Sequence, residues 1–177
     1  MKIKRVICLA IAVLISVTVM SGCFIGESAE IWHISSVLSV NCSNAKLVGK
    51  YDTHGGFHGD GISFYEFSFE DETAIREIRD SGNWKPLPLS DALTEIVWGV
   101  QTDDRYEFPM LTRSNDYERP LFPRVENGYW FFRDRHSDAA DPSDDSHVLD
   151  ESRYSYNFTV AIYDSDTYTL YYSEFDT

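Results

Sequence analysis

The sequence has few cysteines and few basic residues. Only 3 cysteines occur among 177 residues, and 15 lysines and arginines stand against 29 aspartates and glutamates. Three cysteines do not form the even, regularly spaced set of a disulfide-rich secreted domain. The acidic excess provides no basic stripe and repels phosphate backbones, which argues against nucleic acid as a partner.

The chain also lacks an apolar run long enough to cross a bilayer comfortably. Its longest run, residues 6–20, has 15 residues, whereas a transmembrane helix needs about 20. Three basic residues precede this run, and the tetrapeptide MSGC follows it and ends at Cys23. A basic start, a short apolar core and small residues at the end are typical of a secretory signal peptide.

The tetrapeptide MSGC resembles a bacterial lipobox, whose cysteine thiol takes a diacylglycerol group and becomes the new N-terminus. The resemblance implies a signal peptide at residues 1–22, lipid attachment at Cys23 and a tether at residues 23–30, followed by one globular domain at residues 31–177. The alternative is an ordinary cleaved signal that happens to contain a cysteine. Removal of the signal leaves 12 basic against 29 acidic residues, a formal charge of −17.

Alternating apolar residues predict five strands in this domain, at residues 46–51, 62–69, 128–136, 156–163 and 168–175. A short helix is expected to begin with the acidic residues 70–72 and to end just before Gly82, and a second begins after the N-cap Ser90 and ends at Gly99. Residues 100–127 are expected to be mostly loop. This order predicts an α+β domain, with a mainly antiparallel sheet of about five or six strands, the last one inside the sheet, and two short helices packed on the sheet.

The glycine-rich stretch DTHGGFHGDG, residues 52–61, contains the densest group of metal-ligand residue types. Imidazole and carboxylate are the usual ligands of zinc and related ions, and Asp52, His54, His58 and Asp60 lie within nine residues of one another. No established metal-binding spacing is met, since there is no HExxH helix. These four residues are therefore candidate ligands for a divalent metal.

The alternative interpretation of the same stretch is a tight turn between two strands. Glycines at positions 55, 56, 59 and 61 can adopt the positive φ that a hairpin turn needs. The side chains of Asp52 and Thr53 can accept hydrogen bonds from loop amides. The turn interpretation is preferred over the metal site.

A third histidine, His136, stands at the end of a predicted strand. Alternate residues of a strand point to the same side, so Asp134 and His136 are expected to share a side of the sheet. If that side lies near His54, the three residues would form an acid–base or metal cluster, which adds His136 to the candidate metal ligands.

Other chemical signatures are weak. There is no G-x-S-x-G elbow, no phosphate-binding loop and no dinucleotide fingerprint. Six carboxylates within residues 137–151 could bind calcium, but the EF-hand glycine is missing and a solvated acidic loop is preferred. Cys42, the remaining thiol, is expected to be a small buried residue rather than a nucleophile.

Three segments and the lipobox together resemble a family of small lipoproteins of Gram-positive bacteria to which no activity is assigned. The segments are THGGFHGDG, NGYWFFRDRHS and SYNFTVAIYDSDTYTLYYSEFDT. The resemblance implies a domain anchored by lipid on the outer face of the cell membrane, and it implies no activity.

The first functional hypothesis is therefore a lipid-anchored extracytoplasmic binding or interaction domain without catalysis or cofactor. A metal-dependent, hydrolytic enzyme that uses the His54/His58 loop is the alternative. A third hypothesis is an immunity-type lipoprotein that sequesters a cationic toxin or peptide, because an acidic surface tolerates cationic partners.

Overall fold

The fold is described for residues 29–55, 59–113, 115–136, 139–150 and 152–177 of a computed structural model. The predicted signal peptide, Cys23 and His58 lie outside these ranges. Within them, no helix is both long and apolar enough to span a membrane.

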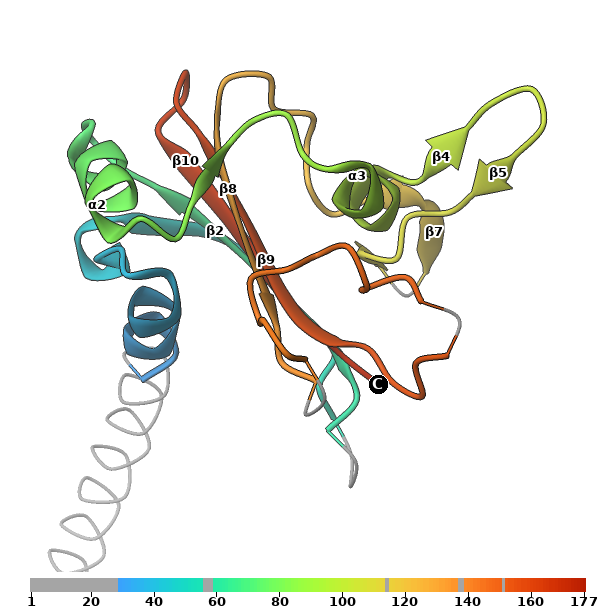
Figure 1. Ribbon diagram of the computed structural model, residues 1–177. Helices are drawn as coiled ribbons and strands as arrows, with labels where there is room; N and C mark the ends of the chain where they lie inside the picture. The colour runs from blue at the N-terminus through green and yellow to red at the C-terminus, as the bar shows by residue number, and fades with distance from the viewer. Residues whose placement is uncertain (1–28, 56–58, 114, 137–138, 151) are drawn as a thin grey trace, which may run out of the picture.

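A six-stranded antiparallel sheet forms the centre of the domain (Figure 1). Its strand order is β1-β2-β10-β9-β8-β3. The strands are β1 (Lys46–Asp52), β2 (Gly61–Ser68), β3 (Lys85–Pro86), β8 (Gly128–Asp134), β9 (Asn157–Asp164) and β10 (Thr169–Asp176). The predicted α+β class and the antiparallel sheet are confirmed. The last strand, β10, lies inside the sheet between β2 and β9, also as predicted.

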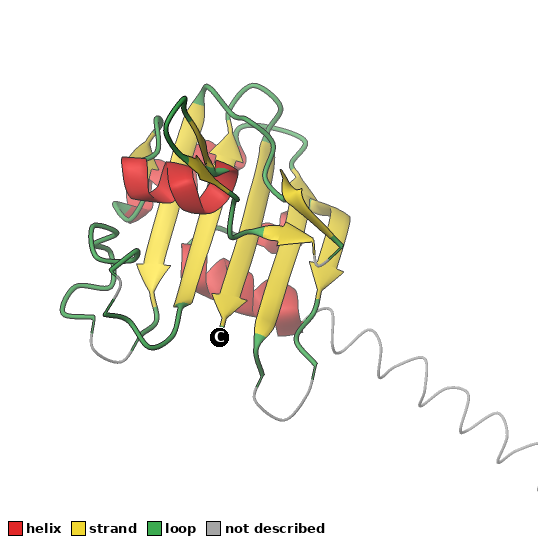
Figure 2. Ribbon diagram, turned by 90° about the vertical axis from the view of Figure 1, so that its right-hand side faces the viewer, coloured by secondary structure: helices red, strands yellow, loops and turns green. Residues whose placement is uncertain are grey.

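Helices cover both faces of this sheet. The helical residues 29–38 and α2 (Thr73–Ser81) lie on one face, and α3 (Asp91–Trp98) lies on the other (Figures 1 and 2). Two of the predicted helix signals are confirmed: the Ser90 side chain accepts a hydrogen bond from the N–H of Leu93, and Gly82 ends α2 in the left-handed conformation with φ 69°. The predicted start at residue 70 is wrong, because α2 begins at Thr73 and the acidic residues 70–72 precede it. Because α2 and α3 lie on opposite faces, each packs on the sheet and not on the other.

The sheet is apolar on both faces, so two cores form. The first core, under residues 29–38 and α2, includes Tyr65, Phe67, Phe131, Tyr163, Leu170 and Tyr172. The second core, under α3, includes Phe64, Trp130, Phe132, Phe158, Val160 and Ile162. The alternation of β2 predicted a half-buried strand. Ser63, Tyr65 and Phe67 are buried on one face and Phe64 on the other, whereas Glu66 and Ser68 are partly exposed.

A helix at residues 29–38 was not predicted. The sequence boundary between tether and domain, at residues 30 and 31, falls inside this helix. Ile34 and Leu38, one turn apart, are buried in the first core, and Glu30 forms an ion pair with Lys50 of β1 at 2.5 Å. The domain therefore includes at least residues 29 and 30.

Residues 100–127 contain more structure than the predicted loop. Two small antiparallel ribbons pair β4 (Val100–Gln101) with β5 (Tyr106–Glu107) and β6 (Thr112–Arg113) with β7 (Asp116–Pro120). Strands this short have no periodicity that a sequence pattern can detect. The segment also closes the second core, into which it inserts Leu111 and Phe122.

Candidate functional site

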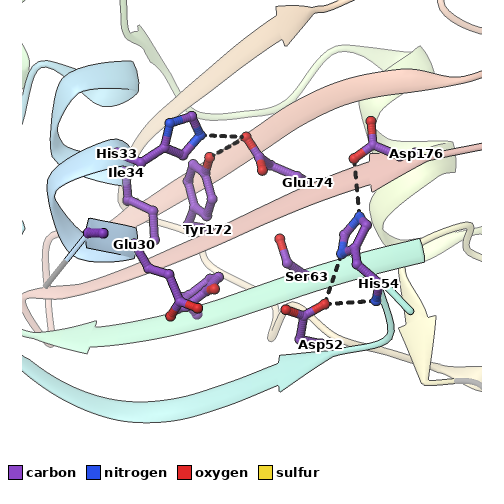
Figure 3. Close-up of a pocket in the computed structure, with 11 residues that line it drawn as sticks. Glu30, His33, Ile34, Asp52, His54, Ser63, Tyr172, Glu174 and Asp176 are labelled. Carbon is purple, nitrogen blue, oxygen red and sulfur yellow. Dashed lines mark hydrogen bonds and ion pairs between the residues drawn. The ribbon is translucent and has the colours of Figure 1, made fainter. Parts of the chain in front are cut away.

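The strongest candidate site is a hollow of about 410 Å³ where the helical residues 29–38 meet the open ends of β1, β2 and β10 (Figure 3). Four carboxylates, two histidines, two tyrosines and a serine line it together with Ala29 and Ile34. These polar residues are Glu30, Asp52, Glu174, Asp176, His33, His54, Tyr65, Tyr172 and Ser63. The apolar first core ends here, and polar side chains of the same sheet face take its place.

The glycine-rich loop positions Asp52 and His54 at the rim of this hollow. The Asp52 carboxylate accepts a hydrogen bond from the backbone N–H of His54 at 2.8 Å, and the Thr53 hydroxyl accepts one from the N–H of Ile62 at 2.9 Å. The predicted side-chain capping of loop amides is thus confirmed. Gly61 is needed for close approach, because an added Cβ would lie 2.7 Å from the backbone nitrogen of His54.

The glycines of this loop have different roles from those expected. Gly59 has a positive φ of 73°, as a turn requires, whereas Gly55 and Gly61 do not have positive φ. Gly56 lies outside the described ranges. The prediction that all four glycines supply positive φ is therefore wrong for two of them.

His54 lies between two carboxylates. Its Nδ1 is 2.8 Å from Asp52 Oδ1, and its Nε2 is 3.1 Å from Asp176 Oδ2. A neutral imidazole has one N–H, so only the doubly protonated ring donates to both carboxylates. Neither nitrogen faces Ser63, and the Ser63 hydroxyl has no hydrogen bond to His54. The serine, histidine and aspartates are therefore not arranged as a nucleophilic triad.

Asp176 has a second partner, Arg135, which directly follows β8. Arg135 contacts its two carboxylate oxygens, with Nη1–Oδ1 at 2.9 Å and Nη2–Oδ2 at 3.0 Å. This two-point geometry is the strongest form of arginine–carboxylate contact. The guanidinium neutralises the Asp176 charge and fixes the side chain that holds His54.

Glu174 has only uncharged or weakly basic partners. Its Oε1 accepts the Tyr172 O–H at 2.6 Å and lies 3.3 Å from His33 Nε2. Burial, followed by the charge of Glu174, raises the pKa of Tyr172, so the phenol keeps its proton and donates it. In the described part of the chain, no lysine or arginine lies within ion-pair distance of Glu174.

The other side of the hollow is formed by Glu30 and Tyr65, and Lys50 contacts both of them. Lys50 pairs with Glu30 and lies 5.2 Å from the centre of the Tyr65 ring. Burial, followed by the nearby charge of Glu30, raises the pKa of Tyr65 to about 12. This side of the hollow therefore has an aromatic ring, and the charge of Glu30 is offset by that of Lys50.

The predicted metal candidates are only partly brought together. Asp52 and His54 are in contact, Asp60 is exposed at the far end of the same loop, and His58 lies outside the described residues. Among the residues that the structure describes, no three His, Cys, Asp or Glu side chains are placed to hold one metal ion.

His136 lines a different hollow, of about 440 Å³, together with Asp134, Arg153 and residues of the acidic loop. Asp134 and His136 share a side as predicted, and the Asp134 carboxylate accepts the backbone N–H of His136 at 2.9 Å. However, Asp134 pairs in register with Phe158, which belongs to the second core, whereas His54 lies beside the first-core face. The cluster of Asp134 and His136 with His54 is therefore not formed.

Asp134 instead forms a buried ion pair with Arg153. The contacts are 2.6 and 3.0 Å long, and the side chains are 5% and 10% exposed. Burial alone would raise the pKa of Asp134, but the hydrogen bonds from Arg153 and from the His136 amide, together with the arginine charge, hold it below its usual range.

Several carboxylates of the acidic loop accept hydrogen bonds from groups of the protein itself. Asp141 accepts hydrogen bonds from the N–H and hydroxyl of Ser143, and Asp144 accepts one from the N–H of Ser146. Asp145 differs from the predicted solvated loop, because it is buried and accepts the hydroxyl of Ser90 at the start of α3. This loop thus helps to fix α3.

Cys42 is a free, fully buried thiol, as predicted. Burial raises its pKa to about 12. A thiol in this state is protonated at neutral pH and is a poor nucleophile.

The C-terminal part of the hollow, Glu174 and Asp176, was not predicted. Tyr172, Glu174 and Asp176 occupy every second position of β10 and therefore share one face of the strand. This spacing is the signal by which the sequence could have identified them. His33 and Ser63 carry no motif, and only the strand and helix arrangement places them in the hollow.

Comparison of the chain with protein-family models, with curated proteins and with solved structures finds no match. The geometry of the hollow is therefore the main basis for a functional proposal.

Proposed function

We propose that this protein is a lipid-anchored extracytoplasmic binding domain whose ligand carries positive charge. The observation that supports it best is the charge balance of the hollow. Lys50 offsets Glu30 and Arg135 offsets Asp176, whereas Glu174 has only His33, and no lysine or arginine, within ion-pair distance in the described residues. Asp52 adds a second carboxylate that has no lysine or arginine within ion-pair distance in the described residues, and a cation entering the hollow is attracted by both.

The net charge of the whole chain also favours a cationic ligand. The predicted mature chain has a formal charge of −17, which attracts cations over long distances and raises their local concentration. The arrangement of His54, whose two nitrogens face carboxylates, favours this binding role over a hydrolytic one. Sequestration of a cationic toxin or peptide, as in an immunity-type lipoprotein, is one form that such binding would take.

The test is a titration of the full chain in nonionic detergent with a tetralysine peptide and, separately, with a tetraglutamate peptide at low salt. We expect tetralysine to bind and tetraglutamate not to bind. Substitution Glu174→Gln should weaken that binding about tenfold, because it removes the uncompensated charge without changing the shape. The matched control is Glu66→Gln, on the opposite face of β2, which should bind as the wild type does.

Salt provides a second check. Raising the ionic strength from 0.02 M to 0.5 M should weaken tetralysine binding, since exposed charges are screened. Equal binding of the two peptides, or an unchanged affinity in Glu174→Gln, would contradict the proposal.

A further inference from the structure

Ser63 is the most informative residue in the hollow. Its side chain is 5% exposed, and its hydroxyl has no hydrogen-bond partner among the described residues. Its backbone carbonyl is used, since the Ser173 hydroxyl donates to it at 2.7 Å. Buried hydroxyls in native proteins are nearly always paired, so an unpaired hydroxyl that faces a hollow indicates a place where a ligand supplies the missing partner.

The sheet register surrounds this hydroxyl with two carboxylates. Ser63 pairs directly with Asp52 on β1 and with Glu174 on β10, so the three residues form one row across three strands. Neighbouring strands lie about 4.8 Å apart, so the two acidic positions are about 10 Å apart with the serine midway between them. The Ser63 hydroxyl points into the space between Glu174 and the Asp52–His54 pair (Figure 3).

The chemistry of this row defines the group that fits it. Ionised carboxylates only accept hydrogen bonds, so an incoming group must supply N–H or O–H donors as well as positive charge. An ammonium group has three N–H donors in a compact volume. A quaternary amine has the charge but no donor, and an anion is repelled.

The next row of the sheet forms an apolar wall for the rest of the ligand. Tyr65 and Tyr172 pair in register beside the Ser63 row, and their ring centres are 6.1 Å apart in an edge-to-face arrangement. Aromatic rings attract nearby cations and pack against methylene groups.

We propose that the hollow binds a primary alkylammonium group, which donates hydrogen bonds to the Ser63 hydroxyl and the Glu174 carboxylate while its carbon chain packs on Tyr65 and Tyr172. This inference rests on the proposed function, because it specifies the cation. The ammonium group belongs either to a free amine or to a lysine side chain of a peptide.

The experiment is a nuclear magnetic resonance titration of the full chain in nonionic detergent, followed at the amides of Ser63 and Glu174. The probes are n-butylammonium, tetramethylammonium and tetralysine. We expect n-butylammonium to bind at least tenfold more tightly than tetramethylammonium, which has the same charge and no N–H. A tetralysine affinity far above that of n-butylammonium would identify a peptide as the source of the ammonium group, and similar affinities would identify a free amine.

The decisive variant is Ser63→Ala. It should weaken n-butylammonium binding about tenfold, because a hydrogen bond to a charged donor is lost. It should also raise Tm by about 2–4 °C, since an unpaired buried hydroxyl is removed. The matched control Ser68→Ala, on the same strand but the opposite face, should leave binding unchanged.

Two results would overturn the proposal. One is that Ser63→Ala binds n-butylammonium as tightly as the wild type does, and the other is that tetramethylammonium binds equally well. If tetralysine still binds in a Glu174-dependent way, only the ammonium assignment fails. If no cation binds at all, the proposed function fails with it.

Discussion

At the scale of single residues, the pair formed by Asp134 and Arg153 is the most consequential charge interaction away from the hollow. Both side chains are buried, and the guanidinium meets the carboxylate at two points. A buried pair is costly to form but far more costly to break on one side, because the remaining charge keeps its desolvation penalty. The pair therefore makes the domain sensitive to the loss of either partner.

Substitution Arg153→Ala should lower the free energy of unfolding by about 3 kcal/mol at pH 6. In the wild type the pKa of Asp134 is depressed, so its stabilisation is present above about pH 4 and is lost as the pH falls through the folded-state pKa. Without the arginine, burial raises that pKa, and stability is instead lost as the pH rises. The difference between wild type and variant should widen from pH 3 to pH 6, measured by urea unfolding.

A matched surface pair provides the control. Arg105 pairs with Glu95 at 2.6 Å but is 52% exposed, so Arg105→Ala should lower the free energy of unfolding far less than Arg153→Ala at either pH. A similar loss in both variants, or a loss in Arg153→Ala that does not change with pH, would show that the buried pair has no special role.

At the scale of elements, the start of α3 depends on one hydroxyl that connects two distant segments. Ser90 accepts the N–H of Leu93 at 3.2 Å and donates to the buried carboxylate of Asp145. The N-cap thus fixes the helix and also fixes the acidic loop that passes beside it. Lys85, 3.5 Å from Asp145, adds a charge on the same carboxylate.

Ser90→Ala should therefore lower the free energy of unfolding by about 2 kcal/mol, because it removes the cap and deprives Asp145 of a hydrogen bond. Ser90→Thr retains the hydroxyl and should lie within about 0.5 kcal/mol of the wild type. Urea unfolding of both variants measures this difference, and equal stabilities would mean that the hydroxyl contributes nothing.

The elements that the sequence predicted correctly are those with a strong local pattern. The hairpin of β9 and β10 alternates along its whole length, and α2 and α3 have a terminal glycine or an N-cap serine. The helix at residues 29–38 was not predicted, because its first two residues were assigned to the tether. The strands β4, β5 and β6 were missed because two residues cannot show a period, and β7 was missed because it is mostly exposed and has no apolar alternation.

The same reasoning explains the partial prediction of the site. Asp52 and His54 contact each other through a turn, which is a local event that sequence can reveal. His54 and Asp176 are 122 residues apart, and only strand pairing brings them together. Ser63 could not be predicted as a site residue either, because only the register of three strands places it between Asp52 and Glu174.

At the scale of the whole molecule, the hollow lies next to the segment that leads to the predicted anchor. Ala29 and Glu30 line the hollow, and they follow Cys23 by six and seven residues. A chain of six residues extends at most about 20 Å. An acyl group on Cys23 would therefore keep the acidic hollow close to the membrane surface.

The anchor itself is tested by Cys23→Ser in a Gram-positive host. We expect the wild type to take up labelled palmitate and Cys23→Ser to take up none, because the thiol of residue 23 is the proposed point of attachment. Cys42→Ser, which alters a buried thiol, is the matched control and should remain labelled. Equal palmitate labelling of Cys23→Ser and the wild type, or no labelling of the wild type, would refute the lipid anchor.

The central place of β10 has a consequence for the order in which the domain can fold. β1 and β2 can pair as soon as they are made, but the other edge of β2 stays open until residues 169–176 are available. Neither core closes before then, and Glu174 and Asp176 of the hollow arrive with that same strand. Folding is thus delayed until synthesis has passed the last strand, since long-range pairing must wait for its partner. A chain that stays open this long can be threaded through a membrane pore and fold on the far side.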